Sequence, residues 1–327
     1  MKGADGQYGK KPGRLKMMAG LKTMSGLKTM MILLCLVMTF AALTGCAKQQ
    51  RPQGYRYVIG LSLPTIREPW LRQMTEDMLG ALPAEEANLI TKDAAGSVEK
   101  QREDIGRLIN SGIDVLIVVP QNMSELEETL RAAYQKIPVI VVGVAPAGSD
   151  YSSCIRFDDE AIGRLLGEQL LTDYQQGDPV VILTGPETSA ISRARLAGLH
   201  AALAGRVQEQ DITFANGEWL RDKAENRMKD YLVGHHAPTK VFAFNDEMAY
   251  GAYMAAEQFR IEGITFFGVD GQEGRFGGRQ LVADGYLQAT ICLPSIGRVA
   301  MDTAMALLKG KEVESMQVLP GEMLHRE

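Results

Sequence analysis

The stretch SGIDVLIVVPQNMSELEETLRAAYQKIPVIVVG, residues 111–143, holds the pattern that decides the fold. Two apolar runs, at 115–120 and 137–143, flank a segment over 124–136 whose apolar residues recur at helical spacing. The valine and isoleucine runs do not alternate with polar residues, so they predict strands buried on both faces. The stretch therefore predicts a strand–helix–strand unit of a parallel sheet covered by helices.

The same alternation of apolar runs and amphipathic segments continues on both sides of this unit. Further strands are expected at 57–63, 88–93, 154–158, 180–185, 212–215, 241–244, 264–269 and 287–293. Further helices are expected at 69–82, 97–111, 159–174, 189–204, 220–234, 247–260, 275–284 and 295–309. So many parallel strands would be unusual in a single sheet. The sequence therefore predicts an α/β fold of two doubly wound, parallel-sheet lobes.

The composition is that of a globular protein with a distinct first segment. The chain has 327 residues, 46% of them hydrophobic, and this length favours two domains. Residues 1–45 hold seven of the 35 basic and one of the 40 acidic residues, which leaves 28 basic and 39 acidic residues in the remainder. Because no basic stripe follows residue 46, nucleic acid is not expected as a partner.

The pattern of residues 1–45 predicts a targeting signal. A basic stretch leads into the apolar run MMILLCLVMTFAAL (30–43), which is short for a membrane span and suits the core of a signal peptide. The run ends in Leu-Thr-Gly-Cys (43–46), which resembles the lipobox of bacterial lipoproteins, with Cys46 as the lipidated residue. An ordinary signal peptide or a single anchor helix is the alternative. Residues 46–56 are expected to form a short tether.

Cysteine and histidine usage points away from metal binding. Cys154 and Cys292 both lie on predicted apolar strands, so two separate buried thiols are expected, with a disulfide as the alternative. His235 and His236 are adjacent rather than spaced as metal ligands on a helix would be. No metal ion and no cofactor are expected.

An enzyme is not expected either. The sequence lacks the GxxxxGK[ST] and GxGxxG phosphate loops and the GxSxG nucleophile turn, and no histidine follows a predicted strand to serve as a base. The neighbouring carboxylates Asp158 and Asp159 are expected to end a strand and cap a helix rather than to act as a catalytic pair.

Polar and aromatic residues gather just beyond the predicted strands. In open parallel sheets ligands bind in the crevice past the carboxyl ends of the strands, and both tryptophans of the chain, Trp70 and Trp219, lie in such positions. Indole rings stack on the C–H faces of a sugar, while Arg195, Asn245 and Asp270 offer charge-assisted or amide hydrogen bonds to its hydroxyls. A binding site for a polyol is therefore expected.

Asn245 also has a plainer interpretation. It opens the run Asn-Asp-Glu before a predicted helix, and such residues cap helix N-termini. Asp246 or Glu247 is expected to provide the cap, which leaves Asn245 for the ligand; a cap formed by Asn245 itself is the alternative.

Several motifs resemble periplasmic sugar-binding proteins of the ribose-binding type, the substrate receptors of ABC transporters. They are VFAFNDEMAYGA (241–252), GVDG (268–271), DGYLQATI (284–291), INSGIDVLIVVP (109–120) and SRARLAGL (192–199). The resemblance covers residues 57 to about 319 and implies two lobes that close around a ligand. It implies sugar-hydroxyl contacts for Asn245, Asp270 and Arg195, with Arg193 as a rival, and stacking for Trp70 and Trp219. The loop LPTIREPW (63–70) is closer to xylose-type receptors and adds Arg67 and Glu68, for which a surface ion pair is the alternative.

The chain also departs from that family's pattern. Ribose-type receptors carry an Asp-Arg pair where this chain has Gly143 and Val144, and a glutamine where it has Cys292. A first-lobe pair that grips hydroxyls is therefore missing. The resemblance thus implies a ligand that is larger than a simple pentose, less hydroxylated on that side, or not a sugar.

The expected organisation follows from these patterns. It consists of a lipoprotein signal peptide at 1–45, a tether at 46–56, a first lobe of 57–157 plus 293–319, and a second lobe of 158–292 plus 320–327. Crossings between the lobes are expected near Phe157-Asp158, Cys292-Leu293 and Leu319-Pro320.

The expected function is that of a solute receptor outside the cytoplasm. A monomer, held to the outer face of the cell membrane or in the periplasm by its N-terminal lipid, would capture a carbohydrate ligand and deliver it to the membrane permease of an ABC importer. The alternative is a receptor that presents its closed form to a membrane sensor kinase or chemoreceptor.

Overall fold

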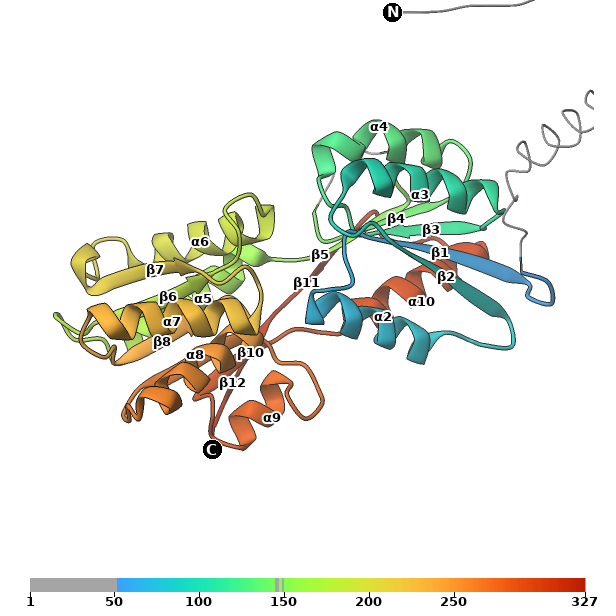
Figure 1. Cartoon of the computed structure of the whole chain (residues 1–327). Helices are drawn as coiled ribbons and strands as arrows, with labels where there is room; N and C mark the ends of the chain where they lie inside the picture. The colour runs from blue at the N-terminus through green and yellow to red at the C-terminus, as the bar shows by residue number, and fades with distance from the viewer. Residues whose placement is uncertain (1–51, 145–146, 149, 327) are drawn as a thin grey trace, which may run out of the picture. The chain divides into compact units, whose positions relative to one another are not determined.

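The computed structural model describes residues 52–144, 147–148 and 150–326, so the expected signal peptide and Cys46 lie outside the described residues. The described chain forms two six-stranded sheets, each covered by helices on both faces (Figure 1). The predicted α/β fold with two parallel-sheet lobes is confirmed. Every predicted strand and helix is present, with ends within three residues of those expected.

The first sheet has the strand order β11-β5-β4-β3-β1-β2, and all of its neighbours are parallel. Its strands are β1 (Tyr57–Leu63), β2 (Ala87–Asp93), β3 (Val115–Val118), β4 (Val139–Val142), β5 (Ser153–Phe157) and β11 (Met316–Leu319). Its helices are α2 (Pro69–Ala81), α3 (Val98–Asn110), α4 (Met123–Tyr134) and α10 (Ile296–Leu308).

Alternate side chains of these strands enter two different apolar layers. Val58 of β1 packs in a cluster with Ile105 of α3 and Leu126 of α4, whereas Ile59 packs in the cluster that holds Leu71 of α2. All of these side chains are almost fully buried. A strand with apolar residues on both of its faces is what such a double-sided core requires, and this explains the unbroken valine and isoleucine runs.

The second sheet has the order β12-β10-β9-β8-β6-β7 and is parallel except at its edge, where β12 runs antiparallel to β10. Its strands are β6 (Val180–Thr184), β7 (Ile212–Asn216), β8 (Lys240–Ala243), β9 (Thr265–Asp270), β10 (Ala289–Cys292) and β12 (Glu322–His325). Its helices are α5 (Asp159–Thr172), α6 (Ala190–Leu203), α7 (Arg221–Gly234), α8 (Asp246–Phe259) and α9 (Gly278–Ala283), and a short 3-10 helix, η1 (Glu209–Asp211), precedes β7.

Three connections lead from one sheet to the other. The chain leaves the first sheet after β5, returns to it after β10, and leaves again between β11 and β12. The two strands β11 and β12 were not predicted, and each adds an edge to a different sheet.

Helices α5 and α6 approach each other closely at two glycines. A Cβ atom added at Gly163 of α5 would lie 1.9 Å from the carbonyl oxygen of Arg195, and one at Gly198 of α6 would lie 1.9 Å from that of Glu160. Both positions therefore need glycine, because the obstructing atoms belong to the backbone. The crossing holds the start of α5 against the middle of α6, which bears on the site below.

Cys154 and Cys292 are separate, buried thiols, as predicted. In the described part of the chain, no helix could serve as a membrane span.

Candidate functional site

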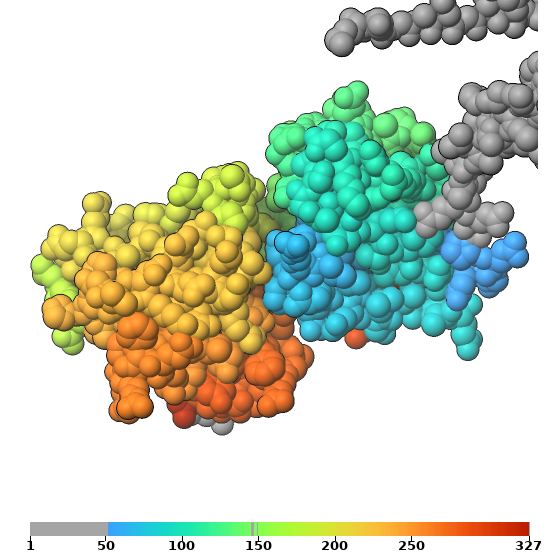
Figure 2. Space-filling model, in the orientation of Figure 1, coloured from blue at the N-terminus to red at the C-terminus, as the bar shows by residue number. Residues whose placement is uncertain are grey.

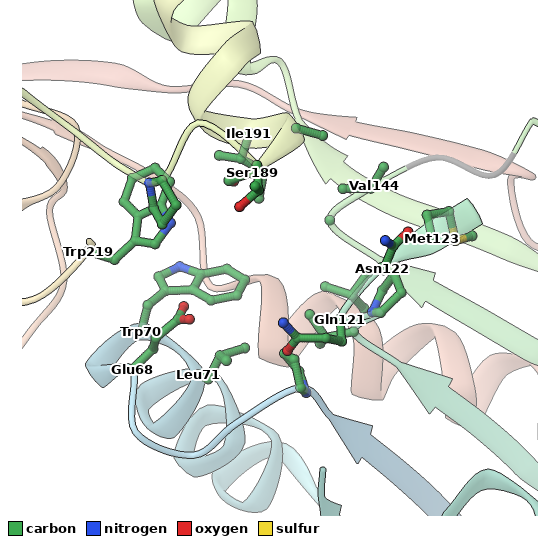
Figure 3. A pocket seen from close by; sticks show the side chains of 18 of the residues that line it. Glu68, Trp70, Leu71, Gln121, Asn122, Met123, Val144, Ser189, Ile191 and Trp219 are labelled. Carbon is green, nitrogen blue, oxygen red and sulfur yellow. The ribbon is translucent and has the colours of Figure 1, made fainter. Parts of the chain in front are cut away.

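A cavity of about 770 Å³ lies among the carboxyl ends of strands from both sheets. The space-filling view shows the two halves of the chain that contribute its walls, and the close-up shows side chains that point into it (Figures 2 and 3). A volume of this size lies within the range of natural ligand sites. The crevice expected from the strand-end residues is therefore present.

Six of the seven residues predicted for ligand contact line this cavity. They are Glu68, Trp70, Arg195, Trp219, Asn245 and Asp270. Arg67 is not among the lining residues: its side chain is exposed, and its backbone carbonyl accepts a 2.7 Å hydrogen bond from the guanidinium of Arg72. The structure thus brings together residues up to 202 positions apart in the chain, and it leaves Arg67 on the surface.

Trp219 is held by an unusual loop between β7 and α7. Glu218 and Trp219 both have left-handed backbone conformations, with φ of 53° and 63°. Such angles are uncommon for residues with side chains. The turn lays the indole directly on Gly185 at the end of β6, where an added Cβ would lie 2.1 Å from the ring. The left-handed turn at 218–219 and Gly185, which are far apart in sequence, therefore fix the Trp219 indole as one wall of the cavity.

Asn245 caps helix α8 and also fixes the Trp219 loop. Its Oδ1 accepts a 2.9 Å hydrogen bond from the amide of Met248, and its Nδ2 donates to the carbonyl of Trp219 at 3.1 Å. The prediction that Asp246 or Glu247 provides the cap is wrong. Asp246 is drawn instead into a buried cluster, and Glu247 forms a 2.7 Å ion pair with Arg221.

Arg195 is buried and faces several partners at once. Its Nε donates to Oδ1 of Asp159 at 2.9 Å, its Nη1 donates to the carbonyl of Phe244, and its guanidinium lies 5.7 Å from the centre of the Trp219 ring. The expected capping role is confirmed for Asp158, whose carboxylate accepts from the amide of Ala161. The pairing of Asp159 with Arg195 was missed, because the two residues are 36 positions apart.

Asp270 presents a carboxylate with no hydrogen-bond donor among the described residues. Its backbone φ is 114°, a strained value for a residue other than glycine, and only 9% of the residue is exposed. Burial raises the pKa of Asp270 to about 7, with the carboxylates of Asp159 and Glu247 adding to the rise and the charge of Arg195 opposing it. A buried acceptor of this kind is suited to a donor supplied by a ligand.

Asp246 supports the turn on which Asp270 sits. Its carboxylate accepts hydrogen bonds from the amide of Gly271 at 2.7 Å and from the hydroxyl of Thr290 at 2.6 Å. Burial, and then the charge of Asp270, raise the pKa of Asp246 well above its ordinary value. The carboxylate of Asp246 therefore fixes the strained turn after β9 through these hydrogen bonds. The sequence had indicated Asp246 only as part of a helix start.

Glu68 brings a further carboxylate to the first-lobe side of the cavity, beside the indole of Trp70 (Figure 3). No described residue donates a hydrogen bond to its side chain or forms an ion pair with it, so the alternative of a surface ion pair does not hold. Burial raises the pKa of Glu68. In the residues that the structure describes, no three His, Cys, Asp or Glu side chains are grouped as a metal ion would require.

The chemistry of this cavity is that of recognition. Two indoles offer flat apolar faces, the carboxylates of Glu68 and Asp270 offer acceptors that no described residue occupies, and the guanidinium groups of Arg193 and Arg195 add positive charge. Aromatic faces combined with charged hydrogen-bonding groups suit a compact molecule that has C–H faces and an equator of hydroxyl groups.

Comparison with known proteins agrees with this architecture. The ribose import binding protein of Bacillus subtilis is 26% identical over 261 residues, which cover 79% of this chain and 84% of the relative. A xylitol-binding protein of Mycolicibacterium smegmatis is 29% identical over 71% of this chain and 67% of the relative.

Two solved structures have a fold similar to that of this chain. An ABC transporter solute-binding protein from Mycobacterium smegmatis with bound glycerol has a TM-score of 0.71 and 28% identity, over 83% of this chain and 94% of that one. The fructose-binding periplasmic domain of a hybrid two-component system has a TM-score of 0.72 and 29% identity, over 83% of this chain and 91% of that one.

The match to a family spans most of the described chain, from residue 59 to residue 312. It includes the strand ends that surround the cavity, and it reaches every strand of both sheets except β11 and β12. The family is one of binding proteins that work outside the cytoplasm, which agrees with the prediction that the chain is not an enzyme. The chain belongs to the periplasmic binding protein domain family.

Proposed function

We propose that the protein is a lipid-anchored receptor that encloses a sugar or sugar-like polyol between its two lobes and delivers it to an ABC importer. The observation that carries this proposal is the convergence of two indoles, two unpaired carboxylates and a buried arginine from both sheets on one cavity. The relatives named for ribose and xylitol, and the similar structure that holds glycerol, support a polyhydroxylated ligand.

In this proposal, each group of the cavity has a defined task. Trp70 and Trp219 pack against the C–H faces of the ligand. Asp270 and Glu68 accept hydrogen bonds from its hydroxyls, and these bonds are charge-assisted when the carboxylates are ionised. Arg195 and Asn245 are engaged mainly with the protein, so they hold the Trp219 wall in place and offer their remaining N–H groups to the ligand.

Binding couples to closure because the ligand must contact both lobes to satisfy these groups. Residues 57–157 with 293–319 form the first lobe in this proposal, and residues 158–292 with 320–327 form the second. A ligand that bonds to Glu68 in one lobe and to Asp270 in the other favours the state in which they are close. The permease then recognises the closed state.

Export and anchoring rest on the first segment of the chain. A basic stretch, an apolar run and the sequence Leu-Thr-Gly-Cys (43–46) support cleavage before Cys46 and lipidation of that residue. The tether at 46–56 would then join the lipid to the first strand. Labelling of cells with a radioactive fatty acid tests this: label is expected in the wild type and not in Cys46→Ala, and label in both would exclude the lipobox.

A second candidate is a sensor. The similarity to a fructose-binding periplasmic domain of a hybrid two-component system favours it, since that protein presents the same fold for signalling. Loss of sugar uptake in a deletion strain supports the importer. Unchanged uptake together with loss of a sugar-induced transcriptional response supports the sensor.

The direct test of the proposal is a thermal-shift screen of the purified protein against pentoses, hexoses, polyols, nucleosides and amino acids. A rise of Tm with one or more polyhydroxylated compounds, and none with amino acids, is expected, since a ligand that binds only the folded state stabilises it. A response to amino acids alone would reject the proposal.

Affinity is expected to depend on pH through Asp270. The folded-state pKa of this group is raised to about 7, so its neutral form predominates below pH 7 and its better acceptor, the carboxylate, above it. Ligand affinity should therefore rise with pH by roughly tenfold or more between pH 5 and pH 8 and level off above. Conversely, the contribution of Asp270 to the stability of the ligand-free protein falls as the pH rises from about 4 to about 7, because the unfolded chain releases this proton earlier.

Calorimetric titrations with ligand at pH 5, 6, 7 and 8 measure how the affinity depends on pH. The Asp270→Asn variant serves as the control and should have a flatter profile. A profile that is the same in both proteins would show that another group, such as Glu68 or Asp246, causes the dependence.

Truncation of the second-lobe indole is expected to weaken binding. Trp219→Ala should cost about 1–3 kcal/mol of binding free energy, which combines the lost stacking geometry with lost apolar contact. Isothermal calorimetry measures the loss, with Phe214→Ala as a matched control because Phe214 is an exposed aromatic outside the cavity. Equal affinities in Trp219→Ala and the wild type would remove Trp219 from the site.

A further inference from the structure

The first-lobe wall of the cavity is apolar where its strands end. Six half-buried or buried residues there make a surface that we call the apolar floor. They are Pro64 after β1, Val119 and Pro120 after β3, Met123 at the start of α4, Val142 at the end of β4, and Val144 beyond it.

The polar side chains beside the apolar floor are engaged with one another. Asn122 caps α4, where its Oδ1 accepts from the hydroxyl of Ser124 at 2.8 Å and from the amide of Glu125 at 3.4 Å. Its Nδ2 donates to Oε1 of Glu125 at 2.5 Å. Among the described polar residues of the first-lobe wall that follow β3, only the amide of Gln121 remains without a side-chain partner, and Figure 3 shows it pointing into the cavity.

The two ends of the cavity therefore differ in chemistry. Figure 3 shows Trp70, Trp219 and Glu68 at one end, and Met123 and Val144 at the other, beside Gln121 and Asn122. The floor also has unfilled space: an added Cβ at Gly143 would meet no atom within 4 Å.

We propose that the ligand is an amphipathic polyol, a sugar ring that carries an apolar substituent such as the alkyl or aryl group of a glycoside. The ring lies at the end with the indoles and carboxylates, and the substituent lies on the apolar floor. This inference rests on the proposed function and narrows its ligand class.

Desolvation decides between this ligand and a free sugar. A hydroxyl placed on the floor would lose its bonds to water and find, on that wall, only the amide of Gln121 without a side-chain partner, which is unfavourable. An alkyl or aryl group placed there leaves water without losing hydrogen bonds. Each buried methyl or methylene group should then raise affinity about fourfold, and a phenyl group at least tenfold.

Calorimetric titration of the full protein with matched pairs tests the inference. The probes are D-xylose, D-glucose and D-galactose, each beside its methyl and phenyl β-glycosides. We expect the glycosides of at least one sugar to bind more tightly than the parent, in the order phenyl, methyl, free sugar. If a free sugar binds as tightly as its glycosides, or more tightly, the inference is wrong while the proposed function stands. If no sugar or glycoside binds, the inference is wrong, and the thermal-shift screen with other sugars, polyols and nucleosides decides the proposed function separately.

Val144→Thr tests the place of the substituent. Threonine has the shape of valine but carries a hydroxyl in place of one methyl group. The variant should therefore fold and lose about three- to tenfold in affinity for the phenyl glycoside while keeping its affinity for the free sugar. Val233→Thr is the matched control, because Val233 is 77% exposed in α7 and should leave both affinities unchanged. Equal losses for glycoside and free sugar in Val144→Thr would overturn the proposed placement.

Discussion

Replacing Asp270 with asparagine is expected to reduce ligand affinity by about 10- to 150-fold, the cost of losing hydrogen bonds to a charged acceptor. The carboxylate lines the cavity, is buried, and accepts no hydrogen bond from the described residues. Its bonding capacity is therefore left to the ligand. Asparagine keeps the size of the side chain and tolerates the positive φ of 114° better than most residues do.

Thermal unfolding of the ligand-free variant separates binding from folding. Asp270→Asn removes a largely desolvated carboxylate that reaches only the cavity and has no donor among the described residues, so its Tm at pH 8 should equal or exceed that of the wild type. Calorimetry should show the loss of affinity in the same preparation. A lower Tm combined with unchanged affinity would make Asp270 a structural residue of the turn after β9.

Replacing Gly198 with alanine is expected to destabilise the protein by about 2–3 kcal/mol, in the upper range for overpacking. The new methyl group would lie 1.9 Å from the carbonyl oxygen of Glu160, a backbone atom that cannot rotate away. Helix α6 must then move off α5. Because Asp159 and Arg195 bridge the same pair of helices, ligand affinity should fall as well.

Gly106→Ala is the matched control for this effect. Gly106 lies inside helix α3, and an added Cβ there meets no atom within 4 Å. The same chemical change should therefore stabilise the protein by about 0.5–1 kcal/mol, through helix propensity and lower entropy of the unfolded chain. Chemical denaturation of both variants measures the contrast. Destabilisation of similar size in both would show that the α5–α6 contact is not the cause.

Much of the fold could be predicted because its central strands are buried on both faces. Runs such as Val115–Val118 and Val139–Val142 have no polar alternation, which is typical of strands in a parallel sheet covered by helices on both faces. Strands β11 and β12 gave no such signal. Their residues are half-buried or exposed at sheet edges, and their stability comes from pairing with β5 and β10 rather than from their own composition.

The position of the site could also be predicted, since strand ends of a parallel sheet converge whatever the side chains are. The partners of individual side chains could not. Asp159 meets Arg195 only through the crossing of α5 and α6, and Asn245 bonds to a carbonyl 26 residues earlier because the Trp219 loop turns left-handed. Contacts of this kind depend on tertiary distances that local sequence patterns do not encode.

The last two strands of the chain limit how the lobes can move. β11 pairs with β5 and β12 pairs with β10, and β5 and β10 are themselves the strands from which the other two connections depart. Only Pro320 and Gly321 separate β11 from β12. All three connections between the two sheets therefore lie side by side, next to the paired strands β5/β11 and β10/β12. This arrangement permits rotation about a common axis and resists sliding or separation of the lobes. In the proposed receptor, the free energy of ligand binding would then drive one rotation of the lobes, so a membrane partner would need to distinguish only two positions along that rotation.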